Sequence, residues 1–512
     1  MRAPTPRKAA LSAAPNATKL SVRAHALLAA SALLGVVACK SPEPAGPETA
    51  AAPEELQNPE TCSSCHPQHY REWASSMHAY AADDPLFIAM NRRGQREANI
   101  GTFCVNCHAP MAVRTGATTD GLNLAELRQQ LKGVTCYFCH NVAAVRGTHD
   151  NPLELANDRV MRGQLDDPQP TGFHGSSYSP LVDRDRLESS QLCGSCHDIV
   201  NQHGVHLERT FGEWQDTVFA EPKVGTTCSQ CHMDRGKIAG PASTLPQAPQ
   251  RELHSHRFPA VDLALTPFPD ADVLASEVQA FLDTSLQSAL CVRGAGSAAQ
   301  IQVVLDNVAA GHSFPSGAAQ DRRVWLEVVA YAGDEIIYES GVVPPDRGLG
   351  SADLDELSWL GDCLLDDRGQ QVRMFWEARD LESNLLPGQQ TFDATDARFY
   401  QTHVRFDYPQ QAATIARFPE RVTLNVKLAP FDLETFDSLV ESGDLEDAPG
   451  ASVAEMRAQL AARNVGRELE WTPEAVTETF TDRGVPISCV SNTNLRANAD
   501  KVPAKRHSRC KP

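Results

Sequence analysis

The chain has 512 residues and a formal net charge of −19, from 46 Lys and Arg against 65 Asp and Glu. Its length suggests two to four domains, and an apolar fraction of 42% is enough for a packed core, which excludes disorder throughout and a polytopic membrane protein. The acidic balance argues against a nucleic-acid partner, because phosphate binding needs clustered Lys and Arg. The unusual counts are 15 Cys and 17 His.

The N-terminus has the pattern of an export signal. Residues 1–25 contain five basic residues and no acidic residue, and an apolar run follows from Ala26 to Ala38. This run is shorter than the roughly 20 residues that cross a bilayer, but it suits a signal-peptide core. It ends in Val-Val-Ala-Cys39, which resembles a bacterial lipobox. We expect a lipoprotein signal over residues 1–38 with a lipid on Cys39; a plain signal peptide or a small buried cysteine is the alternative.

The segment after the lipobox is rich in Pro, Ala and Glu and has no apolar period. Residues 39–57 are therefore expected to form a flexible tether between the lipid and the folded chain. Lys40 follows the cysteine, and a residue other than Asp at this position of bacterial lipoproteins favours sorting to the outer membrane. The predicted location is the periplasm, with attachment to a membrane by the lipid.

Five pentapeptides of the form Cys-x-x-Cys-His stand in residues 58–262. Their cysteines are Cys62, Cys65, Cys104, Cys107, Cys136, Cys139, Cys193, Cys196, Cys228 and Cys231, and their histidines are His66, His108, His140, His197 and His232. The pattern is the signature of c-type haem attachment, in which two thiols bind one porphyrin and the imidazole ligates the iron. Zinc sites or disulfides are the alternatives, but neither requires a histidine after every second cysteine. We expect five haems c.

The sixth ligand of each iron decides what the haems can do. A second imidazole gives an electron carrier, whereas an empty position lets the iron bind a small molecule. After the five proximal histidines and His25 of the signal, eleven histidines remain, which exceeds the five that are needed.

Four cysteines are left besides Cys39, namely Cys291, Cys363, Cys489 and Cys510. An even remainder in an oxidising compartment suggests up to two disulfides, with buried free thiols as the alternative. The pairing is not deducible from the sequence, and the first guess is Cys489–Cys510.

Several stretches resemble the c-554-type multihaem cytochromes in their order and flanking residues. These stretches are Glu72–Tyr80, Gly133–His140, Thr171–His174, Leu207–Trp214, His254–Phe258 and Gly311–Gly317. The resemblance covers about residues 58–330. It implies a periplasmic electron carrier whose haem packing is shared with hydroxylamine oxidoreductase and multihaem nitrite reductases.

The resemblance also implies a set of distal ligands: His78, His174, His256 and His312. The fifth distal position stays open. His206 and His254 are the first candidates, and His203 and His149 are weaker ones. Of these, His206 is included among the predicted ligands. The alternative is one iron with only five ligands.

The rest of the chain carries helix and strand signals. Helical spacing of apolar residues predicts helices over Leu122–Leu131 and, within a connecting segment 263–290, from Asp270 to Leu290. Alternating or β-branched stretches then predict strands at Gln300–Asn307, Arg322–Tyr331, Glu335–Glu339, Val372–Ala378 and Arg421–Leu428. Their spacing indicates a β-sandwich-like domain over 291–430.

Residues 431–512 are expected to hold a C-terminal helix and tail. A capping box at Ser452–Glu455 opens a helix that should run to about Arg463, and the tail should begin at Ser491. The predicted fold class is thus α+β, with a pentahaem domain of helices and loops over 58–262 followed by the β-sandwich-like domain.

The leading hypothesis is a five-haem cytochrome that relays electrons between redox partner proteins. The alternative is a reductase or oxidase of a small nitrogen or sulfur compound at one open-coordinate haem. Against the enzyme stand the lack of a Cys-x-x-Cys-Lys motif and of a visible catalytic cluster, so no catalytic residue is predicted. The β domain could dock a redox partner. The sequence leaves the oligomeric state open.

Overall fold

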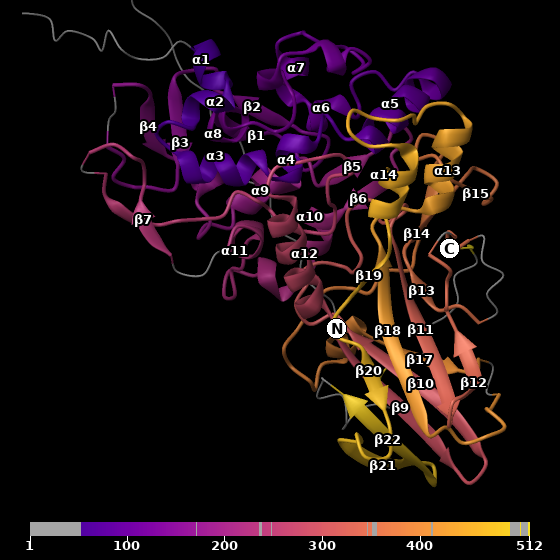
Figure 1. Ribbon diagram of the computed structural model, residues 1–512. Coiled ribbons are helices and arrows are strands. Elements are labelled where there is room, and N and C mark those ends of the chain that lie inside the picture. The colour runs from indigo at the N-terminus through magenta and orange to yellow at the C-terminus, as the bar shows by residue number, and fades with distance from the viewer. Residues whose placement is uncertain are drawn as a thin grey trace, which may run out of the picture. The chain divides into compact units, whose positions relative to one another are not determined.

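The computed structural model describes residues 53–169, 172–234, 238–246, 248–345, 347–350, 356–410, 413–491, 502, 510 and 511. The predicted signal peptide, Cys39 and nearly all of the predicted tail lie outside these residues. Within them the fold is α+β, as predicted, with short helices in the first half of the sequence and long strands in the second (Figure 1). None of the helices in this part of the chain is long and apolar enough to cross a membrane.

The first half consists of short helices joined by loops. The helices are α1 (Pro53–Gln57), α2 (Pro59–Cys62), α3 (Pro67–Ala74), α4 (Met77–Tyr80), α5 (Pro85–Ala98), α6 (Val105–His108), α7 (Pro110–Arg114), α8 (Cys136–His140), α9 (Ser189–Gly194), α10 (Thr210–Gln215) and α11 (Cys228–His232). Three two-stranded sheets lie between these helices: β1 (Val142–Val145) with β2 (Leu153–Leu155), β3 (Val160–Gly163) with β4 (Gly175–Tyr178), and β5 (Asp198–Val200) with β6 (His206–Arg209). A fourth, β7 (Ala239–Pro241) with β8 (Gln250–Glu252), follows α11.

The helix predicted over Leu122–Leu131 is wrong. The segment forms two 3-10 turns, Leu124–Glu126 and Gln129–Leu131, separated by extended backbone at Leu127 and Arg128. Both Leu124 and Leu131 are buried by this arrangement. A ten-residue helix is marginal on its own, so packing decided the conformation.

The second half begins with α12 (Ala271–Ser285), which confirms the connecting helix but ends before Leu290. Two antiparallel sheets follow. The first has the order β17-β10-β9-β22-β21, and the second has β12-β11-β18-β19, with β13 on β11 and β20 on β18. Their bounds are β9 (Gln287–Ala295), β10 (Ala298–Asp306), β11 (Arg323–Ala332), β12 (Glu335–Ser340), β13 (Trp359–Leu360), β17 (His403–Tyr408), β18 (Arg421–Ala429), β19 (Arg463–Asn464), β20 (Leu469–Trp471), β21 (Glu478–Asp482) and β22 (Val485–Ser491).

The two sheets share one apolar core. Ile301 and Val303 from β10 lie in the same buried cluster as Leu326 from β11 and Leu424 from β18. Val278 of α12 also packs into this cluster. Each such side chain contributes about 1.5–3 kcal/mol by leaving water, so the sandwich has its own source of stability.

One predicted strand is wrong over most of its length. Val372–Ala378 pairs only at β15 (Gln371–Val372), which belongs to a small sheet with β14 (Asp362–Leu365) and β16 (Asp380–Ser383). Asn201 Nδ2 donates to the carbonyls of Phe375 and Ala378 at 2.9 and 3.0 Å. These carbonyls are therefore satisfied by a side chain of the first half instead of by a neighbouring strand.

The C-terminal segment contains more structure than predicted. The capping box at Ser452 is confirmed and opens α14 (Val453–Gln459), which is shorter than expected, and α13 (Leu433–Glu441) precedes it. Strands β19 to β22 then return to both sheets, and β22 pairs with β9 in the first sheet.

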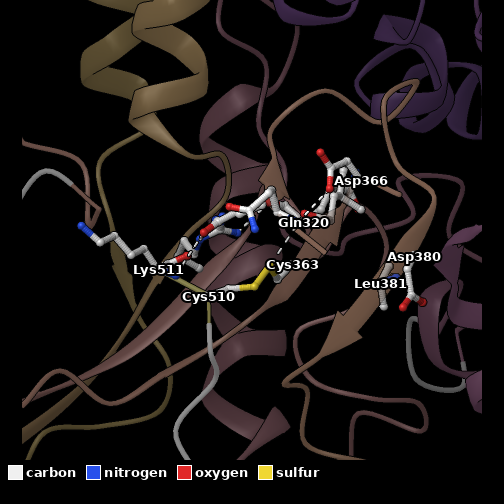
Figure 2. The surroundings of a disulfide bond; sticks show 11 residues. Gln320, Cys363, Asp366, Asp380, Leu381, Cys510 and Lys511 are labelled. Carbon is white, nitrogen blue, oxygen red and sulfur yellow. Dashed lines mark hydrogen bonds between the residues drawn. A yellow bond between two sulfur atoms is a disulfide. The ribbon is translucent and has the colours of Figure 1, made fainter. Parts of the chain in front are cut away.

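Two disulfides are present, but the pairing Cys489–Cys510 is wrong. Cys489 on β22 lies directly opposite Cys291 on β9 and is bonded to it, with the Cα atoms 4.0 Å apart. Cys510 is bonded to Cys363 on β14 (Figure 2). Strand register, which the spacing of cysteines does not reveal, determined the partner of Cys291.

Candidate haem-binding site

All five Cys-x-x-Cys-His motifs line one cavity of about 1890 Å³. None of their ten cysteines forms a disulfide in the structure. Apolar side chains such as Phe138, Leu192 and Phe258 make up part of its wall. The cavity combines thiols, imidazoles and apolar surface, which is the donor set that a covalently bound porphyrin needs, so these residues fit haem c.

Each motif folds into one helical turn. The histidine N–H donates to the carbonyl of the first cysteine, as for His66 to Cys62 at 2.7 Å and His197 to Cys193 at 3.1 Å. In α8 and α11 a threonine caps the turn: Thr135 Oγ1 accepts from Phe138 N, and Thr227 Oγ1 accepts from Gln230 N. Residues three and four positions apart share a helix face, so this turn presents both thiols and the imidazole on one side.

Four of the five proximal imidazoles are oriented by a backbone carbonyl. The Nδ1 atom bonds to Ala242 O at 3.0 Å in His66, to Ala81 O at 2.9 Å in His108, to Arg162 O at 2.5 Å in His140 and to Pro259 O at 2.8 Å in His232. A carbonyl only accepts, so Nδ1 carries the proton and Nε2 is left with a free lone pair. This is the tautomer that an iron bound at Nε2 requires.

Three predicted distal histidines face proximal ones. The ring centres are 6.5 Å apart for His66 and His174, 6.2 Å for His197 and His78, and 6.4 Å for His232 and His312. Two imidazoles bound to opposite sides of one metal ion, at metal–nitrogen distances of about 2 Å, have ring centres about 6 Å apart. His69 is also 6.1 Å from His66.

The buried imidazoles in these pairs are held neutral. Burial lowers the pKa of His78 to about 3, and burial together with the charges of His232 and Arg322 lowers the pKa of His197 to about 4. The pKa of His312 is likewise lowered to about 4, mainly by burial. A neutral imidazole is the form that ligates a metal ion.

The other predicted ligands are placed differently. His256 lines the cavity, with its ring 4.8 Å from His69, and His254 lines it too. His206 is not among the residues that line the cavity; it lies on β6 with its ring 6.0 Å from that of His149. Within the described part of the chain, no second imidazole is recorded in ring contact with His108 or His140.

The motifs touch one another in an order that differs from the sequence. The largest influence on the pKa of Cys62 is the nearby thiol of Cys136; for Cys196 it is that of Cys107, and for Cys193 it is that of Cys228. The first motif therefore contacts the third, while the fourth contacts both the second and the fifth. Cys139 of the third motif is near enough to raise the pKa of Cys193 and Cys196, although their own thiol contacts and burial act more strongly. All five attachment points thus form one connected cluster.

Sequence reasoning missed the residues that surround these ligands. Asn307, buried on the loop after β10, donates from Nδ2 to the carbonyls of His312, Leu386 and Pro387 at 2.8, 3.0 and 3.2 Å. Arg322, directly before β11, lines the cavity. Nothing in the local sequence marks either residue, because each meets the cavity only through the fold.

The comparisons with known proteins agree with this geometry. Residues 61–141 match the family described as cytochrome c554 and c-prime. The chain is similar in fold to a penta-haem cytochrome c552 from Thermochromatium tepidum, with a TM-score of 0.53 and 18% identity, covering 80% of this chain and 97% of that one. No curated protein matches the chain. Residues 61–141 are thus similar to the cytochrome c554 family, and the chain shares the fold of a penta-haem cytochrome.

Proposed function

We propose that this protein is a multihaem c-type cytochrome, a five-haem electron relay between redox partner proteins. The observation that carries the proposal is the connected cluster of five motifs around one cavity. Thiol contacts link the first motif to the third and the fourth motif to the second and fifth. Haems attached at neighbouring cysteines are held close together, and short separations are what electron transfer between cofactors requires.

Each bound haem supplies a one-electron couple at its iron. The protein residues hold the ligands rigid and neutral, since carbonyls orient the proximal imidazoles and burial keeps His78 and His312 unprotonated. Paired imidazoles keep an iron in the six-coordinate state that favours electron transfer over ligand binding. His66–His174, His197–His78 and His232–His312 are the pairs we assign on this basis. His256 is assigned to the third haem because it lines the cavity and, after burial and His69, His140 of the third motif contributes to lowering its pKa.

The haem number is tested by intact mass. The purified chain, after extraction of non-covalent groups, should weigh five haems more than the mature polypeptide. A matched variant, Cys228→Ala with Cys231→Ala, should weigh one haem less and keep the other four. A wild-type mass with fewer than five haems, or bound zinc at the motifs, would contradict the relay.

We further propose a periplasmic location with a lipid on Cys39, outer membrane favoured. Its support is the apolar run that ends in Val-Val-Ala-Cys39. Cys39→Ser should release the holoprotein from the membrane fraction into the soluble periplasmic fraction. Cys363→Ser with Cys510→Ser is the control, since it changes cysteines elsewhere and should leave fractionation unchanged. Equal membrane binding of Cys39→Ser and wild type would contradict the anchor.

A second candidate is reduction or oxidation of a small nitrogen or sulfur compound at one open haem. The observation behind it is the surroundings of His108. Among the described residues, the ring stacked on His108 is that of Phe87, with the ring centres 4.0 Å apart. The predicted ligand His206 lies on β6 and does not line the cavity. Low-temperature electron paramagnetic resonance of the ferric protein separates the two functions. A high-spin signal equal to one haem in five would favour the enzyme, and low-spin signals alone would favour the relay.

A further inference from the structure

The cavity wall contains a guanidinium that comes from the β-sandwich. Arg322 directly precedes β11 and lines the haem cavity, with only 15% of its side chain exposed. Its Nη2 atom donates to the carboxylate of Asp262, which belongs to the segment between the last motif and α12, and its Nη1 atom donates to the carbonyl of Ser316. The guanidinium is therefore held in place by two partners, Asp262 and Ser316.

The chain makes room for this side chain. Gly317 has φ +71°, and a Cβ atom there would collide with Arg322 Nη1. The positive φ favours a glycine at this position, and any larger residue would also require the end of the Arg322 side chain to shift. The guanidinium thus occupies a place that the local backbone is shaped to leave open.

The charge of Arg322 lies close to two of the assigned haem sites. Its Nη1 atom bonds to Ser316, four residues after His312, whose ring lies 6.4 Å from that of His232 in the fifth motif. The fourth and fifth motifs are themselves in contact, since Cys228 N donates to Ser190 Oγ on α9, the helix that carries Cys193, at 3.3 Å. Arg322 therefore acts on a neighbouring pair of haem positions at once.

We infer that Arg322 is the residue through which the β-sandwich sets the reduction potentials of the fourth and fifth haems. The inference rests on the proposed relay. A ferric haem carries one more positive charge than a ferrous haem, so a fixed cation nearby favours the reduced state and raises the midpoint potential. In a site shielded from water this effect is larger than at the surface.

The other charges that face Arg322 determine how the inference is tested. Asp262 is its ion-pair partner, and Asp321 and Glu208 also line the cavity and interact with it. Removing the cation leaves Asp262 uncompensated, which should lower the potentials further. Removing the Asp262 charge instead leaves the cation unbalanced, which should raise them. Opposite signs from the two partners distinguish an electrostatic role from simple loosening of the fold.

The experiment is a potentiometric titration of the full-length holoprotein, followed by optical and paramagnetic resonance spectra. Arg322→Gln should lower the midpoint potential of one or two haems and leave the others unchanged. A tenfold change in the reduction equilibrium corresponds to about 59 mV for a one-electron couple, and we expect a shift of that order. Arg322→Lys keeps the charge and should retain most of the wild-type potential. Asp262→Asn should shift the same haems upward.

The matched control is Arg417→Gln, which removes an equal charge from an exposed pair with Glu335 on the sandwich and should move no potential. Unchanged potentials in Arg322→Gln, or shifts of the same sign in Arg322→Gln and Asp262→Asn, would overturn the inference. If Arg322→Gln does not fold, the other two variants still test the inference: the midpoint potentials should rise in Asp262→Asn and stay near the wild-type values in Arg322→Lys. The wild-type mass reports separately on the relay, because a haem number below five would contradict the relay whatever Arg322 does.

Discussion

At the scale of single residues, the site depends on where each imidazole holds its proton. Backbone carbonyls of Ala242, Ala81, Arg162 and Pro259 accept from Nδ1 of four proximal histidines. Each carbonyl lies between 22 and 176 residues along the chain from the histidine that it orients. The motif predicts which residue ligates iron, while the orientation of that residue depends on contacts that only the fold creates.

His312 provides the sharpest residue-scale prediction. Its ring is nearly parallel to that of His232, at an interplanar angle of 9°, and Asn307 and the Nδ1 contact with Ser313 O at 2.8 Å hold it there. His312→Ala should convert one haem of the five from low spin to high spin, as seen in the ferric resonance spectrum and the visible bands. The pairing explains the effect, because the iron at His232 would lose its sixth ligand.

His203→Ala is the matched control, because His203 is exposed and does not line the cavity. It should leave the spectra unchanged. A His312→Ala protein with five low-spin haems would show that His312 does not ligate iron.

At the scale of elements, the sequence was most informative where a pattern is local. Strands such as β11 follow from contiguous residues and formed as predicted. The helix expected over Leu122–Leu131 did not form; two 3-10 turns bury Leu124 and Leu131 instead.

The pairing of β22 with β9 could not be predicted, because it joins residues about 200 positions apart and determines the bond Cys291–Cys489. The same reason applies to the distal ligands. His312 belongs to a loop of the sandwich, 80 residues beyond His232. The periodicity of apolar residues does not reveal a contact between His312 and His232. Only the resemblance to a known family pointed to His312 as a distal ligand.

At the scale of the whole molecule, the two halves of the described chain are joined by charged and polar contacts as well as by the predicted ligand His312. Arg209 of β6 donates to Asp362 of β14 at 2.7 Å. Thr210 and Glu213 of α10 bond to Ser316 in the loop that follows His312. These groups are largely buried, so each loses contact with water, and its pairing offsets that loss. The desolvation cost is larger when the group is charged, so it depends on the protonation state.

Glu213 makes this junction sensitive to pH. Burial raises the pKa of Glu213 to about 7, against an ordinary value of 4.5, although Ser316 and Arg209 partly oppose the shift. The folded state therefore binds more protons than the unfolded state between these values. The free energy of unfolding should fall as the pH rises from about 4.5 through 7, and should stay level with respect to this group above pH 8. The loss from this one group is at most about 3 kcal/mol.

Glu213→Gln keeps the size of the side chain and an oxygen that accepts from Ser316 Oγ, but it cannot ionise. We expect the variant to resist guanidinium more than wild type at pH 8 and to match it at pH 5, when unfolding is followed by both haem absorbance and far-ultraviolet circular dichroism. Glu335→Gln, at an exposed carboxylate, should show no such difference. Because Glu213 touches both halves, its substitution should move the haem and strand transitions together. A pH dependence identical to wild type, or a shift in only one transition, would show that this carboxyl does not couple the two halves.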